Sequence, residues 1–270
     1  MRGRSLALIG GMMRIGMFLG PIAGGFIGKL LGMHTVFLSM AFLTIISFLI
    51  VLFIRGEASV HIEQKASHEI HFARRLWLVL KENRSVFIRT GIPVIILQIL
   101  RTARLILFPL WGEAIGLDLA QIGLIVGISS AIDLIVFYPM GSIMDRFGRK
   151  WTAVPCISLL SVGILFIPLA GNFIELLLVG VLAGIGNGFG SGIVLTLGAD
   201  LSPEKDTGHF LGLWRLICDI GTTGGPGIVG GVSEILGLAA APVSIAIPGF
   251  LGALMMAIWA KETLVRKASD

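Results

Sequence analysis

The amino-acid sequence predicts an all-α fold, a polytopic membrane bundle of eight transmembrane helices. Of its 270 residues, 55% are hydrophobic and 14% are charged, whereas average soluble chains carry about 25% charged residues. Most side chains therefore have to face lipid or other helices. A bilayer offers no partner for open backbone groups, and the apolar runs show no strand-like alternation, so these runs are expected to be helices.

Crossing roughly 30 Å of hydrocarbon takes about 20 apolar residues in a helix. Eight runs approach or exceed this length, at approximately 5–29, 34–54, 87–110, 120–142, 151–170, 173–198, 209–233 and 239–260. Both cysteines, Cys156 and Cys218, fall inside these runs, which argues against a disulfide framework and a metal site. No cofactor is expected. The first apolar stretch is longer than the core of a signal peptide, so no cleavable signal is expected.

Lys and Arg are unevenly distributed over the connections between these runs. The connections near Gly32, 111–119, 171–172 and 237–238 contain none, and only Lys29 lies close by. The alternate connections and the chain ends hold Arg2, Arg4, Arg55 through Arg89, Arg146, Arg149, Lys150, Lys205, Lys261, Arg266 and Lys267. Because basic loops stay in the cytoplasm, this predicts a plasma (inner) membrane protein with both termini cytoplasmic. The net charge of +5 is assigned to this orientation signal, and not to nucleic-acid binding.

One long polar segment, 55–86, divides the chain. It separates two helices (1–54, expected to close an N-terminal bundle) from a six-helix C-terminal bundle with a short cytoplasmic tail (87–270). Its stretch HFARRLWLVLKENR either forms an amphipathic surface helix or is a solvated linker. In the first case an apolar face would meet lipid and a basic face would meet anionic headgroups; the apolar residues are Phe72, Leu76, Val79 and Leu80, and the basic ones Arg74, Arg75, Lys81 and Arg84.

An internal repeat occurs at an offset of 205 residues. The stretch beginning at Gly16 reads GMFLGPIAGG and the stretch beginning at Gly221 reads GTTGGPGIVGG, which aligns Pro21 with Pro226. Glycine and proline interruptions at corresponding places are typical of transporters built from related halves. If these helices are equivalent, six helices separate them, and the complete parent has six plus six.

The most specific motif is G-x-x-x-D-R-x-G-R-K after the fourth run. Its fixed positions are Gly141, Asp145, Arg146, Gly148, Arg149 and Lys150. It resembles the loop signature of the major facilitator superfamily, which lies between the second and third helices and again between the eighth and ninth. The resemblance implies that the chain corresponds to helices five to twelve and that the first four helices are missing. These helices, in a longer parent, are a possible partner of the chain.

The loop chemistry is consistent with a cytoplasmic latch. Gly141 would let a neighbouring helix come close, Gly148 would allow a sharp turn, and Asp145 would pair with Arg149. By resemblance the latch docks on the helix carrying Arg14 and uses an acid at the end of the preceding bundle, with Asp200 or Glu204 as candidates. The alternative is a basic loop that only sets orientation.

A second motif resembles the helix-five motif of drug:proton antiporters in the same superfamily. It comprises Gly16, Gly20, Pro21, Gly24 and Gly25. Glycines four residues apart form a flat stripe on which another backbone packs, and a proline bends the helix, so generic packing is the alternative. A further ladder, Gly180 to Gly192, predicts close packing and bending of the sixth run.

Six charged residues lie inside the apolar runs, where an unpaired charge costs several kcal/mol. They are Arg14, Arg101, Arg104, Asp133, Arg215 and Asp219. At about 1.5 Å per residue, Asp133 and Asp219 lie about 10 to 17 Å from the cytoplasmic edge. These two are the proposed proton carriers, because a desolvated aspartate binds a proton and an approaching arginine releases it. Arg215, one turn from Asp219, alternatively neutralises it.

The sequence therefore predicts a secondary active transporter that moves small organic molecules by proton-coupled alternating access, with efflux favoured. Its expected partners are the lipid bilayer, the substrate and protons. The excess of arginine over aspartate alternatively suits uptake of an organic anion, and a truncated, non-transporting membrane fragment or interaction protein is the other alternative. No nucleotide loop, metal-ligand spacing or nucleophile with a neighbouring base indicates an enzyme.

Overall fold

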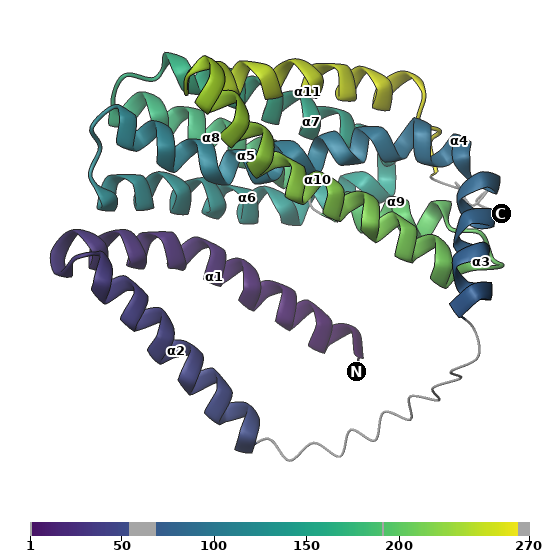
Figure 1. The fold of residues 1–270 in the computed structure, drawn as a ribbon, viewed down its shortest axis with the longest axis horizontal. Coiled ribbons are helices and arrows are strands. Elements are labelled where there is room, and N and C mark those ends of the chain that lie inside the picture. The colour runs from purple at the N-terminus through teal and green to yellow at the C-terminus, as the bar shows by residue number, and fades with distance from the viewer. Residues whose placement is uncertain (1, 54–68, 191, 264–270) are drawn as a thin grey trace.

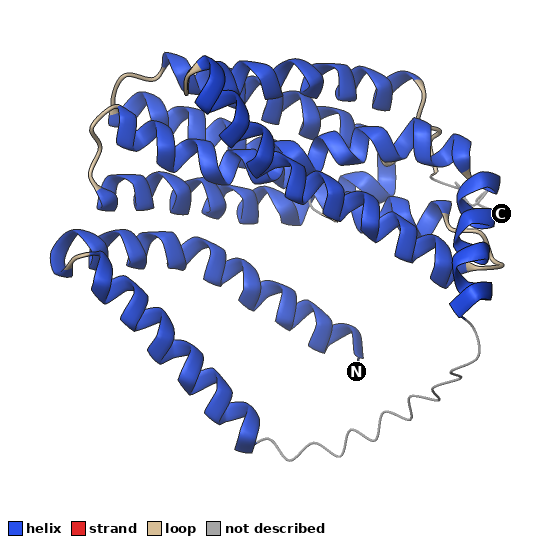
Figure 2. Ribbon diagram, in the orientation of Figure 1, coloured by secondary structure: helices blue, strands red, loops and turns tan. Residues whose placement is uncertain are grey.

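A computed structural model describes residues 2–53, 69–190 and 192–263, and every regular element in this part of the chain is helical (Figure 2). The helices are α1 (Arg2–Leu31), α2 (Met33–Phe53), α3 (Glu69–Glu82), α4 (Arg84–Val86), α5 (Ile92–Ala114), α6 (Leu119–Phe147), α7 (Lys150–Phe166), α8 (Phe173–Phe189), α9 (Ile193–Leu201), α10 (Thr207–Leu236) and α11 (Ala240–Ile258). A π-helical turn, η1 (Phe87–Gly91), joins α4 to α5, and a 3-10 turn, η2 (Ile167–Leu169), follows α7.

Six helical stretches are long and apolar enough to cross a membrane. They are Met33–Phe53, Arg84–Ala114, Leu119–Phe147, Lys150–Leu169, Phe173–Leu201 and Ala240–Ile258. Two expected spans are helical but fall outside this group. In α1 the described apolar stretch is the shorter Ile15–Leu31, and α10 carries charged residues within its length. The all-helical class is confirmed, whereas a count of eight crossings stays a prediction.

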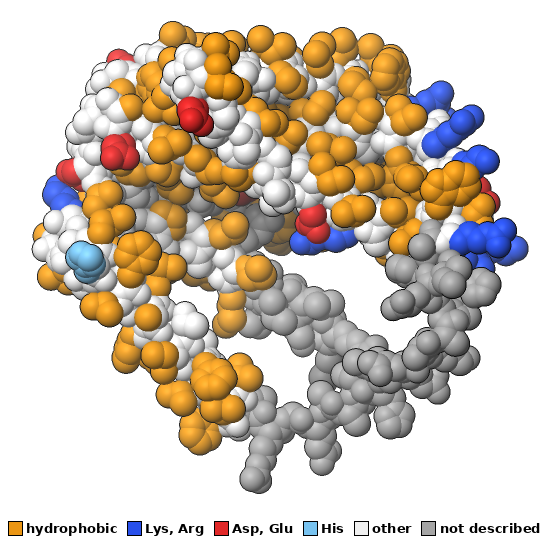
Figure 3. Space-filling view, viewed as in Figure 1, with side chains coloured by type: hydrophobic (Ala, Val, Ile, Leu, Met, Phe, Trp, Pro, Cys, Tyr) orange, Lys and Arg blue, Asp and Glu red, His pale blue; other side chains and the backbone are white. Residues whose placement is uncertain are grey.

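The helices form a bundle of α5 to α11 with α1 and α2 inclined beside it (Figure 1). Fully buried Leu97 and Leu100 of α5 and Leu160 of α7 lie in the core. Only α1 of the first two helices runs along the bundle, where it packs on α6; α2 has no buried residue. Hydrophobic side chains cover the flank of the bundle, and Lys and Arg gather at the end near α3 (Figure 3). This distribution suits a protein embedded in lipid.

Local sequence signals set the start of α6. Asp118 accepts hydrogen bonds from the N–H groups of Ala120 and Gln121, and Gln121 accepts one from the Asp118 N–H, which forms a capping box. Lys29 Nζ at the end of α1 donates to Asp118 Oδ2 at 2.8 Å. This bond, with the backbone donors, holds the pKa of the Asp118 carboxyl below its ordinary value. The pair connects the end of α1 to the start of α6.

Glycines let neighbouring helices of the bundle approach closely. In α8, a Cβ added to Gly184 would overlap the backbone oxygen of Ser129 in α6. In α10, a Cβ added to Gly221 would lie 2.5 Å from the backbone oxygen of Ile95 in α5. These positions exclude a larger side chain because the opposing atoms belong to the backbone.

The corresponding glycines of α1 are used differently. Gly16, Gly20 and Gly24 have no described atom within 4 Å of an added Cβ, whereas Gly25 lies against the backbone oxygen of Leu119. The stripe expected to pack along its whole length therefore contacts α6 only towards its C-terminal end. In the repeat, Gly221 packs on α5 while its partner Gly16 faces open space.

The sixth expected helix is broken in two. The α8 helix ends at Phe189, and α9 begins after Gly192, whose φ of +83° is left-handed. Such a φ strains residues with a Cβ but not glycine. The glycine ladder thus allows both the close packing and the interruption. Broken helices occur at membrane depth where the open backbone lines a cavity.

Part of the polar segment 55–86 is helical, and residues 54–68 lie outside the described part. Helix α3 packs against α10, and Arg75 Nε donates to Asp206 Oδ1 at 2.8 Å. Val79 is 3% exposed and belongs to the protein core. In the surface-helix alternative Val79 was expected to face lipid; this is wrong, because its side chain is buried in the core. The side chain of Phe72 lies outside the described residues.

Candidate functional site

A cavity of about 600 Å³ lies between α1 and the bundle. Its walls come from α1, α5, α6, α8 and the start of α9. Apolar side chains of α1, α5 and α6 form one side, among them Met13, Met17, Leu105 and Val126. The polar lining consists of Arg101, Arg104, Ser130, Asp133 and Asn187. A few polar groups in an apolar hollow are typical of small-molecule binding sites.

Arg101 of α5 is held at the break between α8 and α9. Its Nη2 donates to the backbone oxygen of Gly190 at 2.7 Å, and its Nη1 donates to Gln98 Oε1 at 3.2 Å. Gly190 leaves room for this contact, since an added Cβ would lie 2.9 Å from Nη2. The buried Nε has no hydrogen-bond partner among the described residues. Arg101 lines the cavity, and a guanidinium is suited to bind an anionic group.

Arg104 lies one turn further along α5 and is 6% exposed. Its Nη1 donates to Ser129 Oγ at 3.4 Å and to the backbone oxygen of Ala183 at 3.3 Å. Because Ser129 is in α6 and Ala183 in α8, this one side chain links three helices. Burying a charge lowers the stability of the fold unless neighbouring groups stabilise the charge. A buried arginine at this position therefore indicates a functional role.

Asp133 of α6 accepts a hydrogen bond from Asn187 Nδ2 of α8 at 2.6 Å. Both residues line the cavity together with the two arginines. The expected pairing of Asp133 with Arg101 stays a prediction.

The other expected membrane charges lie elsewhere. On α10, Arg215 Nε lies 3.0 Å from Asp219 Oδ1, and the two side chains are 76% and 50% exposed. Neither residue lines the cavity. The geometry favours the alternative in which Arg215 neutralises Asp219. The side chain of Arg14 lies outside the described residues, although its neighbours Met13 and Met17 line the cavity.

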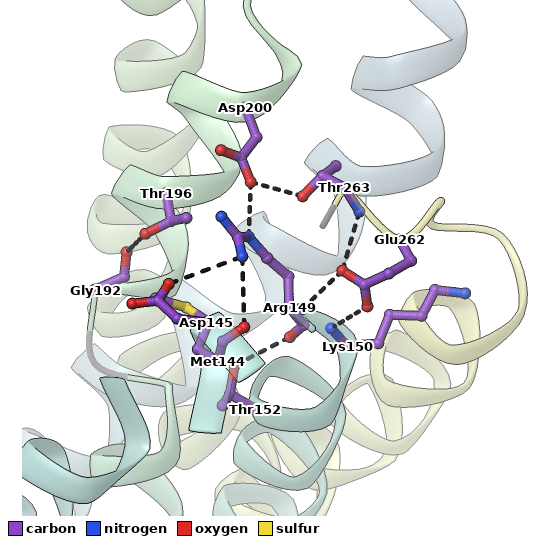
Figure 4. A network of polar contacts seen from close by, with 10 residues as sticks. All are labelled: Met144, Asp145, Arg149, Lys150, Thr152, Gly192, Thr196, Asp200, Glu262 and Thr263. Carbon is purple, nitrogen blue, oxygen red and sulfur yellow. Dashed lines mark hydrogen bonds and ion pairs between the residues drawn. The ribbon is translucent and has the colours of Figure 1, made fainter. Parts of the chain in front are cut away.

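The loop motif forms a second polar cluster at the basic end of the bundle (Figure 4). Arg149 Nε donates to Asp200 Oδ2 at 2.7 Å, while Arg149 Nη1 and Asp145 Oδ1 are 3.8 Å apart. Asp145 is 74% exposed and Asp200 is 23% exposed. Of the two candidate acids, Asp200 and not Glu204 meets Arg149. The network joins the start of α7 to the end of α9.

Glu262 completes this cluster from the C-terminal end. Its Oε1 accepts from the Arg149 N–H at 2.8 Å and its Oε2 from the Lys150 N–H at 3.1 Å (Figure 4). The start of α7 has no side-chain cap of its own, so Glu262 supplies the missing acceptor and a favourable charge at the positive helix end. Gly148, with φ of +113°, provides the turn, and the carboxylate occupies the space of its absent Cβ.

Gly141 behaves differently from expectation. An added Cβ would meet no described atom within 4 Å, so the expected close helix approach at this position is not found. The loop contacts just described go to α9 and to residues after α11. Docking on the helix that carries Arg14 stays a prediction.

Comparison with known families decides the class of the protein. The family profile described as Major Facilitator Superfamily matches residues 1–101 and 94–269. The chain belongs to the major facilitator superfamily. Members of this superfamily are secondary transporters, and a multi-pass membrane protein of this class agrees with the six apolar helices. No curated protein matches the chain. The antiporter branch and the missing helices stay predictions.

Sequence reasoning missed three contributors to these sites. Asn187 lies within the glycine ladder of the sixth run, where an amide in an apolar run is a signal of its own. Ser129 carries no distinctive pattern. Glu262 lies in the polar C-terminal segment, where a carboxylate gives no signal in the sequence. Only the folded structure places it at the start of α7.

Proposed function

We propose that the chain works as a secondary active transporter of small organic molecules by proton-coupled alternating access. One observation carries the proposal: charged residues of α5 and α6 meet in a cavity of about 600 Å³ between α1 and the bundle. Arg101 and Arg104 would hold the substrate, and Asp133 would carry the proton. The resemblance of the α1 glycine motif to drug:proton antiporters supports efflux.

Coupling follows from the environment of Asp133. Asn187 donates to Asp133, and rocking of α1 against the bundle would change this contact and so couple Asp133, the proposed proton carrier, to transport. Asp133→Asn should then abolish accumulation driven by a proton gradient while substrate exchange continues. Flux is measured in proteoliposomes with and without an imposed pH difference. A mutant that still responds to the gradient like the parent would assign Asp133 a structural role.

An organic anion is the second candidate substrate. Two arginines and one aspartate line the cavity, which leaves one excess positive charge. Competition of an organic carboxylate and a lipophilic cation for the same labelled substrate distinguishes the candidates. The third candidate is a fragment that does not transport. It would be supported if neither ligand were transported by this chain and if adding four N-terminal helices restored the flux.

A further inference from the structure

A smaller cavity, of about 240 Å³, lies at the basic end of the bundle. It is formed where α4 and η1 meet the end of α9 and the residues after α11. Ser85, Arg89 and Thr90 line it from one side, and Trp259 and Lys261 from the other. It is separate from the transport cavity, which shares none of these residues.

The described lining of this cavity carries positive charge, from Arg89 and Lys261. No carboxylate is among its described lining residues. Two acids that adjoin lining residues in the sequence have other partners: Asp200 accepts from Arg149, and Glu262 accepts from the start of α7. Arg89 and Lys261 therefore present two positive charges to one concave site. Such a site concentrates anions.

The donor set suits a phosphate group. A guanidinium fork, an ammonium and two hydroxyls match the several oxygens of a phosphate better than the two of a carboxylate. Arg89 and Thr90 both come from the π-helical turn η1, and such turns are frequent at functional sites. Thr90 is 4% exposed and lines the cavity.

The surroundings indicate where the phosphate comes from. Trp259 and Trp77 are 51% and 59% exposed at the same end of the bundle, and Lys81 Nζ lies 5.2 Å above the Trp77 ring. Tryptophan and basic residues gather at the level of lipid headgroups. Figure 3 shows Lys and Arg side chains concentrated at this end.

We propose that the cavity between η1 and the end of α11 binds a phosphate group through Arg89 and Lys261. Its position favours the headgroup of an anionic phospholipid over free phosphate. Binding would join the start of α5, which carries Arg101 and Arg104, to the chain end that carries Glu262. The occupied site would thus brace the cluster around Arg149.

The test uses the purified 270-residue chain in neutral detergent. Phosphatidylglycerol, phosphatidylcholine or inorganic phosphate is added at constant ionic strength, and the thermal unfolding midpoint is followed to saturation. Phosphatidylglycerol should stabilise the chain saturably, and phosphatidylcholine less, because its headgroup is neutral overall. Arg89→Gln and Lys261→Gln should each raise the half-saturating concentration about fivefold.

Arg74→Gln is the matched control, since it removes an exposed cation of α3 outside the cavity, and it should change the half-saturating concentration less than twofold. Arg89→Lys should recover part of the loss and covers the case in which Arg89→Gln does not fold. Equal stabilisation of the parent by inorganic phosphate, lost in both glutamine variants, would support the site with free phosphate as its source. Equal weakening by Arg74→Gln, or no saturable stabilisation of the parent by either ligand, would overturn the proposal.

Discussion

At the residue scale, two acids lie near Arg149, and their distance and exposure differ. Asp145 lies in the loop motif, one helical turn before Arg149, but it is 74% exposed and 3.8 Å away. Asp200 is distant in sequence, yet it is 23% exposed and 2.7 Å away. Exposed pairs contribute little because water screens them. Asp200 is therefore the main partner.

This ranking gives a prediction for the loop cluster. Asp200→Asn should destabilise the cluster around Arg149 by about 1 to 2 kcal/mol. This corresponds to a roughly 5- to 30-fold fall in the population of the state that contains the cluster, and transport should slow accordingly. Asp145→Asn, the matched change, should cost less than about 0.5 kcal/mol. The initial rate of substrate flux in proteoliposomes measures both. A larger effect for Asp145→Asn would mean that the distance between Asp145 and Arg149 is shorter in another state of the transport cycle.

At the element scale, α6 and α8 are held together through backbone contact at Gly184. Replacing it by alanine would push a Cβ into the backbone oxygen of Ser129, and a backbone cannot rotate away. Gly184→Ala should therefore lower stability by about 1 to 3 kcal/mol. Gly20→Ala on α1, with open space around it, should be neutral or slightly stabilising. Thermal unfolding midpoints in detergent compare the two, and equal shifts would contradict this packing.

The docking of α3 on α10 should depend on pH. The Arg75 guanidinium, which donates to Asp206, holds the pKa of that carboxyl below its ordinary value, and the pKa of Arg75 is raised in turn. The folded-state pKa of Asp206 is depressed, so the pair contributes fully above the ordinary value of about 3.9. Its contribution is lost as the pH falls through the lower folded-state pKa.

Hydrogen exchange of residues 74–82 tests this. At neutral pH, Asp206→Asn should lower the protection factors of the α3 amides relative to the parent, and acidifying the parent through the depressed pKa of Asp206 should lower them in the same way. His209, whose Nδ1 lies 3.4 Å from Asp206 Oδ1, provides the control: His209→Gln should leave the contact between Arg75 and Asp206 in place. If α3 exchanges at the same rate in the parent and in Asp206→Asn, apolar packing at Val79 holds it alone.

At the scale of the whole molecule, the distribution of basic residues predicts the orientation in the membrane. Basic residues gather at one end of the bundle, and the opposite end carries Lys29 paired with Asp118. Under the positive-inside rule the basic end faces the cytoplasm. Exposed positions at both ends, Glu204 and Gly171, allow a direct test.

With Cys156 and Cys218 replaced by alanine, a cysteine at Glu204 should resist a membrane-impermeant thiol reagent in intact cells, with less than about a tenth of the labelling seen after permeabilisation. A cysteine at Gly171 should label fully in both conditions. The opposite pattern would invert the topology while leaving the fold unchanged.

The sequence alone determined the helical class, the approximate limits of the apolar helices and the family resemblance. These follow from composition, run length and one contiguous motif, which are properties of neighbouring residues. It also singled out Arg101, Arg104 and Asp133, because charges within apolar runs are conspicuous.

Only the tertiary structure decided which of these charges share a cavity. It placed Arg215 and Asp219 outside, brought Asn187 to Asp133 and assigned Asp200 and Glu262 to the start of α7. It also showed that the sixth expected helix is interrupted next to Arg101. Each of these contacts joins residues far apart in the chain, and their distance depends on how the helices cross. Hydrophobic periodicity specifies that a helix forms and which face it buries, but it does not specify the residue of another helix that lies opposite.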